Sequence, residues 1–124
     1  MIKAVTTARV APVAGPFSPA VQSGGTVYIS GQVAQDPATG KLLEGDVARQ
    51  ADQAFRNLGA VLDACGKSFT DVVRVGVFVT DGASFSAMND VYRRYFQPPY
   101  PARTSVVVAA LPLGAAIEVD AIAT

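Results

Sequence analysis

The sequence predicts an α+β fold in which two helices lie on one face of a mixed sheet. Segments rich in strand-forming residues occur with two segments whose apolar residues recur every three or four positions, and Gly, Pro and Asp clusters separate them. The expected order is β-β-α-β-α-β-β, an α+β pattern. The chain has 124 residues, a usual length for one domain, so residues 1–124 are expected to form a single domain.

Two strands are expected before the first helix. Residues 21–25 are interpreted as an approach and a turn, because Gly24-Gly25 breaks any regular element. Residues 26–33 (TVYISGQV) are rich in β-formers and predict a strand. Turn residues at 36–40 (DPATG) then favour a short returning strand at 41–43.

Helical spacing defines the two helices. Asp46 is a good N-cap, Gly66 is a stop signal, and the helix between them should be about 30 Å long. Ser84 is expected to cap a second helix over residues 85–96, which the prolines of residues 97–101 end. The apolar positions of the first helix are Val47, Ala51, Ala54, Phe55, Leu58, Val61, Leu62 and Cys65.

Three further strands are expected. Residues 71–80 are almost continuously apolar, which is typical of a central strand. Strands at about 103–110 and from 117 to 121 or beyond follow, linked by residues 111–114 (LPLG). If these two strands pair as a simple hairpin, with Ala110 opposite Ile117, Arg103 and Glu118 lie roughly 20 Å apart and cannot share a small ligand within one subunit.

Those two charges are unusual because each lies in an apolar strand, where removing water from an ion is costly. Each also fits a plain structural role, since Arg103 could be solvated at a strand edge and Glu118 could point outward between inward-facing neighbours. A functional interpretation is that they grip a small carboxylate across a subunit interface.

Composition excludes several kinds of chemistry. The chain has no histidine, so Ser-His-Asp or Cys-His catalysis and the usual His-based metal sites are excluded. Formal net charge is zero with no basic stripe, which disfavours nucleic acid and anionic membranes as partners. The first residues have no signal-peptide pattern, and no apolar run is long enough to span a membrane. Cys65 is the only cysteine, so no internal disulfide can form. A cytoplasmic protein is therefore expected. Only 16% of residues are charged, which suggests that part of the surface is buried against further copies of the chain.

Several segments together resemble the RidA (formerly YjgF) family of reactive-intermediate deaminases, over nearly the whole chain. The most specific match is Pro101-Ala102-Arg103 followed at the expected distance by Ile117-Glu118. The other matching segments are Gly15 to Ala20, Ile29 to Gln32, Gln53 to Leu62, Val77 to Val79 with Asp81, the helix positions Asn89, Tyr92 and Phe96, and Ala109 to Pro112.

The resemblance implies a chorismate-mutase-like fold and a homotrimer with its sites in clefts between subunits. It implies hydrolysis of 2-enamines and 2-imines such as 2-aminoacrylate to 2-keto acids and ammonia, without a metal or organic cofactor. Arg103 would bind the substrate carboxylate and Glu118 would orient the attacking water. The substrate-binding residues would be Phe17, Ser30, Gly31, Asn89, Arg103 and Ser105.

Two of these positions depart from the family pattern. Phe17 stands where many members have tyrosine, and Ser105 stands where many have cysteine. Two alternatives stay open. Phe17 and the apolar segment Pro98-Pro99-Tyr100 fit a related deaminase with a larger substrate such as 2-aminomuconate. Arg103 alone would serve a non-enzymatic protein that binds a carboxylate metabolite.

Overall fold

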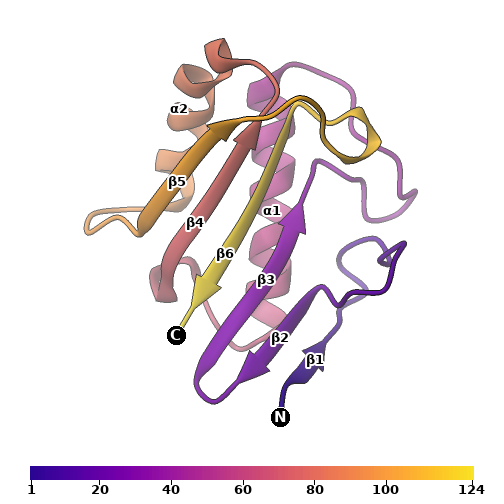
Figure 1. Cartoon of the computed structure of the whole chain (residues 1–124), viewed down its shortest axis with the longest axis vertical. Coiled ribbons are helices and arrows are strands. Elements are labelled where there is room, and N and C mark those ends of the chain that lie inside the picture. The colour runs from indigo at the N-terminus through magenta and orange to yellow at the C-terminus, as the bar shows by residue number, and fades with distance from the viewer.

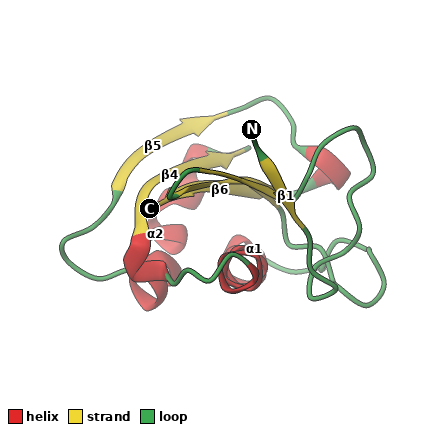
Figure 2. Ribbon diagram, turned by 90° about the horizontal axis from the view of Figure 1, so that it is seen from below, coloured by secondary structure: helices red, strands yellow, loops and turns green.

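The computed structural model describes all 124 residues and has one six-stranded sheet with both helices on the same face (Figures 1 and 2). The strand order is β1-β2-β3-β6-β4-β5, in which β4 and β5 run parallel and every other neighbouring pair is antiparallel. The expected α+β class with a mixed sheet is therefore confirmed. The strands are β1 (Lys3–Val5), β2 (Ala20–Ser23), β3 (Thr26–Gln32), β4 (Val72–Val79), β5 (Ala102–Val107) and β6 (Ile117–Ala123).

Both helices form where the apolar spacing predicts them. Helix α1 (Val47–Ala64) begins at Asp46, whose side chain accepts a hydrogen bond from the Arg49 backbone N–H at 2.9 Å. Gly66 follows it with a φ of 72°, a left-handed conformation suited to glycine. Helix α2 (Phe85–Tyr95) also matches, but Ser84 makes no side-chain cap bond, so that expectation was wrong. Neither helix combines the length and apolar character needed to cross a membrane.

The strands before α1 differ from the expectation. Residues 41–43 form no strand, and a single bridge joins Leu42 to Gln35. The backbone of this segment bonds to the other side of its own loop, so it never reaches the sheet: the Asp36 N–H donates to the Lys41 carbonyl, and the Leu43 N–H donates to the Ala34 carbonyl. The early partner of β3 is instead β2, across the Gly24-Gly25 turn, and β1 extends the sheet beyond it.

The expected terminal hairpin was also wrong. Strand β4 lies between β5 and β6, so these two strands do not pair with each other. Residues 108–116 include a short 3₁₀ turn at Pro112–Gly114 and carry the chain over the end of β4 to its other side (Figure 1). The central position predicted for β4 is confirmed, because β4 pairs in parallel with β5 and antiparallel with β6.

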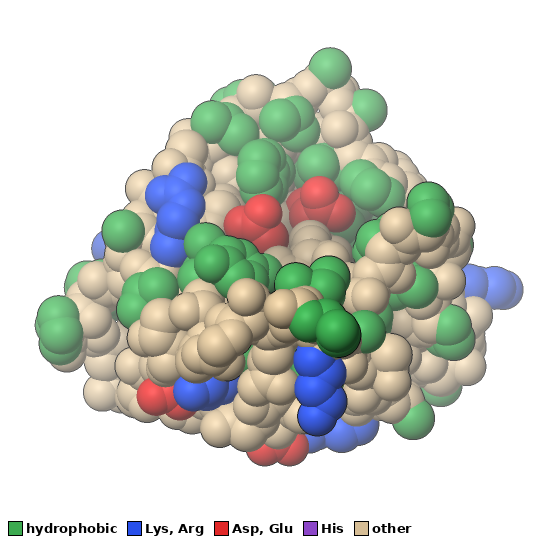
Figure 3. Space-filling view, turned by 60° about the horizontal axis from the view of Figure 1, so that its bottom comes forward, with side chains coloured by type: hydrophobic (Ala, Val, Ile, Leu, Met, Phe, Trp, Pro, Cys, Tyr) green, Lys and Arg blue, Asp and Glu red, His purple; other side chains and the backbone are tan.

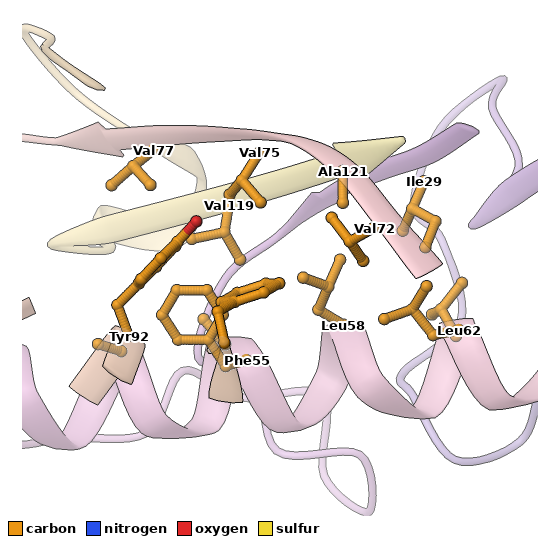
Figure 4. Close-up of a cluster of buried hydrophobic side chains, with 14 of the residues drawn as sticks. Ile29, Phe55, Leu58, Leu62, Val72, Val75, Val77, Tyr92, Val119 and Ala121 are labelled. Carbon is orange, nitrogen blue, oxygen red and sulfur yellow. The ribbon is translucent and has the colours of Figure 1, made fainter. Parts of the chain in front are cut away.

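The core lies between the sheet and the helices (Figure 4). Phe55 of α1 is fully buried and contacts Tyr92 of α2 and Phe96, the residue that follows α2, edge-on, with ring centroids 5.7 and 5.9 Å away. A fully buried side chain of this kind contributes about 1.5–3 kcal/mol from removal of apolar surface. This packing holds α2 against α1 and thereby places the α2 face that lines a pocket with β5.

A buried amide holds the segment that follows β3. The Asn57 side-chain NH₂ donates to the backbone carbonyls of Val33 at 3.0 Å and Gln35 at 2.9 Å. Its own oxygen accepts from Gln53 at 2.9 Å. Asn57 is buried, so these bonds are shielded from water and define the path of the chain as it leaves β3.

We expect Asn57→Ala to lower the free energy of unfolding by about 2–4 kcal/mol, because it removes two hydrogen bonds from a buried amide to backbone carbonyls and leaves the Gln35 carbonyl without its side-chain donor. Urea unfolding at fixed protein concentration measures the change. Gln53→Ala is the matched control, since it removes only the bond to Asn57 and should cost less than half as much. Equal losses in the two variants would contradict this role of Asn57.

Candidate functional site

Arg103 lies on the helix face of the sheet, at its β5 edge. It is the register partner of Val75, which is fully buried toward the helices, and neighbouring residues in register point to the same face. Its guanidinium carbon lies 4.8 Å from the centre of the Tyr92 ring, a cation–π contact that steadies the side chain. The ion pairs of the structure involve Arg9, Arg56 and Arg93, so the Arg103 charge has no carboxylate partner.

A hollow of about 280 Å³ surrounds this guanidinium, and we call it the arginine pocket. One wall comes from α2 and the other from the segment that enters β5. Its lining contains hydrogen-bond donors and no carboxylate, so it suits an anion. The lining residues are Asn89, Tyr92, Arg93, Tyr100, Pro101 and Arg103.

Glu118 lies on the opposite face of the sheet. Its neighbours Ile117 and Val119 are fully buried toward the helices, so Glu118 points away from them. It lines a second hollow of about 280 Å³, which we call the glutamate pocket. Most of that lining is apolar and includes Phe17, Val33 and Leu113.

The surroundings of Glu118 make it a stronger base than an ordinary carboxylate. Partial burial raises the pKa of the Glu118 carboxyl, and the negative charge of nearby Asp120 raises it further. A carboxylate with a raised pKa accepts a proton from water more readily near neutral pH. No three His, Cys, Asp or Glu side chains cluster in a way that could hold a metal ion.

Gly31 allows the close approach of Glu118 to the β3 backbone. The pairing of β3 with β6 shifts register between Ile29 and Gln32, and Gly31 lies in this irregular stretch. A Cβ built on Gly31 would lie 2.7 Å from the Glu118 carboxyl carbon, closer than real Cβ contacts. The absence of a side chain at residue 31 therefore leaves space for the carboxyl group.

We expect Gly31→Ala to displace the Glu118 carboxyl and, for the imine hydrolysis that the family resemblance implies, to reduce kcat by roughly tenfold or more. The fold should tolerate the change within about 1 kcal/mol, because the displaced group is the end of a flexible side chain. Gly25→Ala is the matched control, since nothing lies within 4 Å of a Cβ at that position. Unchanged turnover in a folded Gly31→Ala variant would show that the placement of Glu118 does not matter.

The other predicted substrate-binding residues do not all line the same pocket. Asn89 lies with Arg103, whereas Phe17 and Gly31 lie with Glu118, and Phe17 is 55% exposed. The Ser30 hydroxyl donates to the Ser18 carbonyl at 2.6 Å, so it positions the segment that carries Phe17 and does not line either pocket. Ser105 is exposed on β5, two residues beyond Arg103, and lines neither pocket.

The structure therefore places Arg103 and Glu118 in two pockets on opposite faces of one sheet, and we call these pockets candidate half-sites. The hairpin geometry expected from the sequence was wrong, but the separation of Arg103 from Glu118 remains for a different reason. Side chains on opposite faces of a sheet cannot contact one small ligand, whatever their distance along the strands. A ligand that touches both groups must lie between two copies of the chain.

Several residues that line these pockets were not predicted as site residues, among them Tyr92, Arg93 and Leu113. Tyr92 and Arg93 could have been found from helical spacing, because Asn89, Tyr92 and Arg93 follow the i, i+3, i+4 pattern of one helix face. Leu113 carried no such signal: it lines the glutamate pocket in a left-handed conformation with φ of 60°, which is rare for leucine.

Comparison with known sequences identifies relatives over almost the full length. Residues 7–124 match the family model described as endoribonuclease L-PSP. A 2-iminobutanoate/2-iminopropanoate deaminase from Bos taurus is 48% identical over 121 residues, which cover 98% of this chain and 88% of that protein.

Solved structures have the same fold. RidA from the Antarctic bacterium Psychrobacter sp. PAMC 21119 superposes with a TM-score of 0.94 at 42% identity, covering 98% of each chain. E. coli TdcF with bound serine superposes with a TM-score of 0.93 at 37% identity, again covering 98% of each chain. The arrangement of sheet and helices in this chain is thus shared with proteins of clearly related sequence.

Proposed function

The chain belongs to the RidA family of reactive-intermediate deaminases, and we propose on this basis that it hydrolyses small 2-enamines and 2-imines, such as 2-aminoacrylate, to 2-keto acids and ammonia. The observation that carries this proposal is the unpaired guanidinium of Arg103 in a pocket without carboxylates. Such a group suits the carboxylate that every 2-imino acid presents beside its reactive carbon. The relative with bound serine, itself a small amino acid, supports a ligand of this size.

Arg103 would hold the substrate carboxylate through two parallel N–H donors, which fixes the plane of the ligand as well as its position. Asn89 of the same pocket would offer its amide to the ligand. Tyr92 beneath the guanidinium restricts its rotation and so reduces the entropy lost on binding.

Glu118 would act on water. A 2-enamine becomes the imine by protonation at its β-carbon, and water then attacks C2 of the imine. We propose that Glu118 accepts a proton from this water and returns one to the nitrogen, after which ammonia leaves the tetrahedral adduct. The imine is already electrophilic, so positioning and one modest base are sufficient.

We propose that the active unit is a homotrimer in which the arginine pocket of one subunit faces the glutamate pocket of its neighbour. The location of the half-sites on opposite faces supports a shared site. Asp120, Tyr28 and Val106 are among the residues that line a hollow of about 800 Å³ on the uncovered sheet face. Figure 3 shows acidic side chains set among apolar ones on one face of the molecule, a mixture that favours contact with further protein over open solvent.

We propose a single RidA-like domain over residues 1–124 that acts in the cytoplasm on small molecules. Equal numbers of acidic and basic residues provide no attraction to a phosphate backbone, so nucleic acid is not proposed as a partner.

The decisive experiment generates 2-aminoacrylate or 2-iminobutanoate in situ with a pyridoxal-phosphate enzyme and follows imine loss and keto-acid release. We expect hydrolysis well above the spontaneous rate. Light scattering on the same sample should give three times the mass of the 12.8 kDa chain. A folded, trimeric protein that leaves the spontaneous rate unchanged would refute the proposed activity.

A further inference from the structure

The arginine pocket contains more positive charge than a monocarboxylate needs. Arg93 and Arg103 both line it, and no acidic side chain does. A simple 2-imino acid such as 2-iminobutanoate has one carboxylate, which Arg103 would bind under the proposed function. The second guanidinium is then left without a substrate group to contact.

Arg93 is placed to reach a ligand that Arg103 already holds. Asn89 and Arg93 are four residues apart on α2, so their side chains lie about one helical turn apart on the same face. Arg103 faces them from β5 across the hollow of about 280 Å³. A small linear molecule held at one end by Arg103 would therefore extend along this helix face.

The existing partner of Arg93 does not prevent this contact. Arg93 pairs with Asp90 at 3.1 Å, and the two side chains are 61% and 74% exposed. An ion pair so open to water contributes little free energy, so a ligand carboxylate can compete for the guanidinium. Asp90 itself does not line the pocket and would not repel the ligand directly.

We propose that Arg93 is a specificity-determining residue that favours substrates with a second carboxylate, namely 2-imino dicarboxylates and the corresponding enamines. This inference rests on the proposed deaminase function and concerns the same site. The reaction is unchanged: water adds to C2, the C–N bond breaks, and the products are a 2-oxo dicarboxylate and ammonia. The distal carboxylate contacts Arg93 and takes no part in bond making.

Binding of the products tests the inference without turnover. Calorimetry would compare 2-oxoglutarate, its 5-amide as a neutral analogue, and 2-oxobutanoate. We expect 2-oxoglutarate to bind about tenfold more tightly than the other two, as is usual for one charge-assisted contact at a partly exposed site. Arg93→Gln should remove that preference and leave 2-oxobutanoate affinity within about twofold.

Arg94→Gln is the matched control, because Arg94 is the next residue of α2 and does not line the pocket. It should leave all three affinities unchanged. Equal affinity of the wild-type protein for the three ligands would overturn the inference. An Arg93→Gln variant that loses affinity for all three ligands equally, or that has a changed oligomeric mass, would also overturn it.

Measurements of turnover distinguish an error in this inference from an error in the proposed function. Hydrolysis of 2-iminobutanoate without any preference for 2-iminoglutarate would refute the role of Arg93 alone. Failure to accelerate hydrolysis of either imine would refute the deaminase proposal, and the substrate preference would fall with it.

Discussion

Arg103→Ala is expected to lower kcat/KM on 2-iminobutanoate by roughly 10²- to 10³-fold, since it removes the charge-assisted anchor of the substrate carboxylate. Arg103 is exposed on an edge strand and makes no ion pair within the subunit. Its loss should therefore leave the fold of the subunit intact. Steady-state kinetics with imine generated in situ, alongside thermal unfolding, measures both effects.

Two companion variants sharpen this result. Arg103→Lys keeps the charge but loses the planar pair of donors, so we expect it to recover only part of the lost affinity. Arg94→Ala removes an arginine outside the pocket and should change neither parameter. Full activity of Arg103→Ala would show that the carboxylate binds elsewhere.

Glu118→Gln is expected to reduce kcat by roughly 10²- to 10⁴-fold, the usual contribution of a positioned general base. Glutamine fills the same volume beside Gly31, so substrate and product should still bind. The measurement is single-turnover kinetics with 2-oxobutanoate binding as the control. Normal turnover in this variant would remove Glu118 from the mechanism.

The raised pKa of Glu118 gives turnover by the wild-type protein a characteristic pH dependence. In the wild-type protein, kcat should rise with pH as the carboxyl loses its proton, above the ordinary value of 4.5. Asp120 contributes to the raised pKa, so Asp120→Asn should move this limb of the profile to lower pH. An unmoved limb would mean that another group controls it.

The same shift affects stability with a definite sign. The folded state holds the Glu118 proton more tightly than the unfolded state, so this group favours folding below its unfolded pKa and loses that contribution as pH rises through its folded pKa. Glu118→Gln should therefore melt at a higher temperature than the wild type near neutral pH. The difference should vanish in acid, below a pH of about 4.

Mixing the two inactive variants tests the shared site directly. If each site takes Arg103 from one subunit and Glu118 from its neighbour, subunit exchange between Arg103→Ala and Glu118→Gln should restore some intact sites. At equal amounts the restored activity should approach about a quarter of the wild type, since each half is intact with a probability of one half. No recovery after verified exchange would refute the shared site.

The helices and the central strand could be predicted because their signals are local. The 3.6-residue spacing around Phe55 and the cap at Asp46 specify α1 without reference to any other element. Strand pairing is not local. Nothing in residues 102–107 shows that they pair in parallel with β4, and nothing in residues 117–123 shows that they cross to its far side.

Prediction of the candidate site residues also depended on both local signals and non-local strand pairing. Arg103 and Glu118 stood out as single charges in apolar strands, and the family resemblance then gave each of them a role. Alternation along each strand indicated the direction of each side chain. The pairing of β4 with both strands was needed to learn that these directions are opposite. Leu113 illustrates the remaining gap, because its left-handed backbone is imposed by the turn around Pro112 and not by its own preference.

Strand β5 has one more consequence. All six of its residues are exposed, and its outer edge has no partner strand. An isolated subunit consequently displays unpaired backbone donors and acceptors beside an incomplete catalytic centre. If the trimer forms as proposed, dilution would dissociate it and lower specific activity and solubility together. Enzyme concentration would then regulate both. In newly synthesised subunits, assembly of the trimer would compete with aggregation through the free edge of β5.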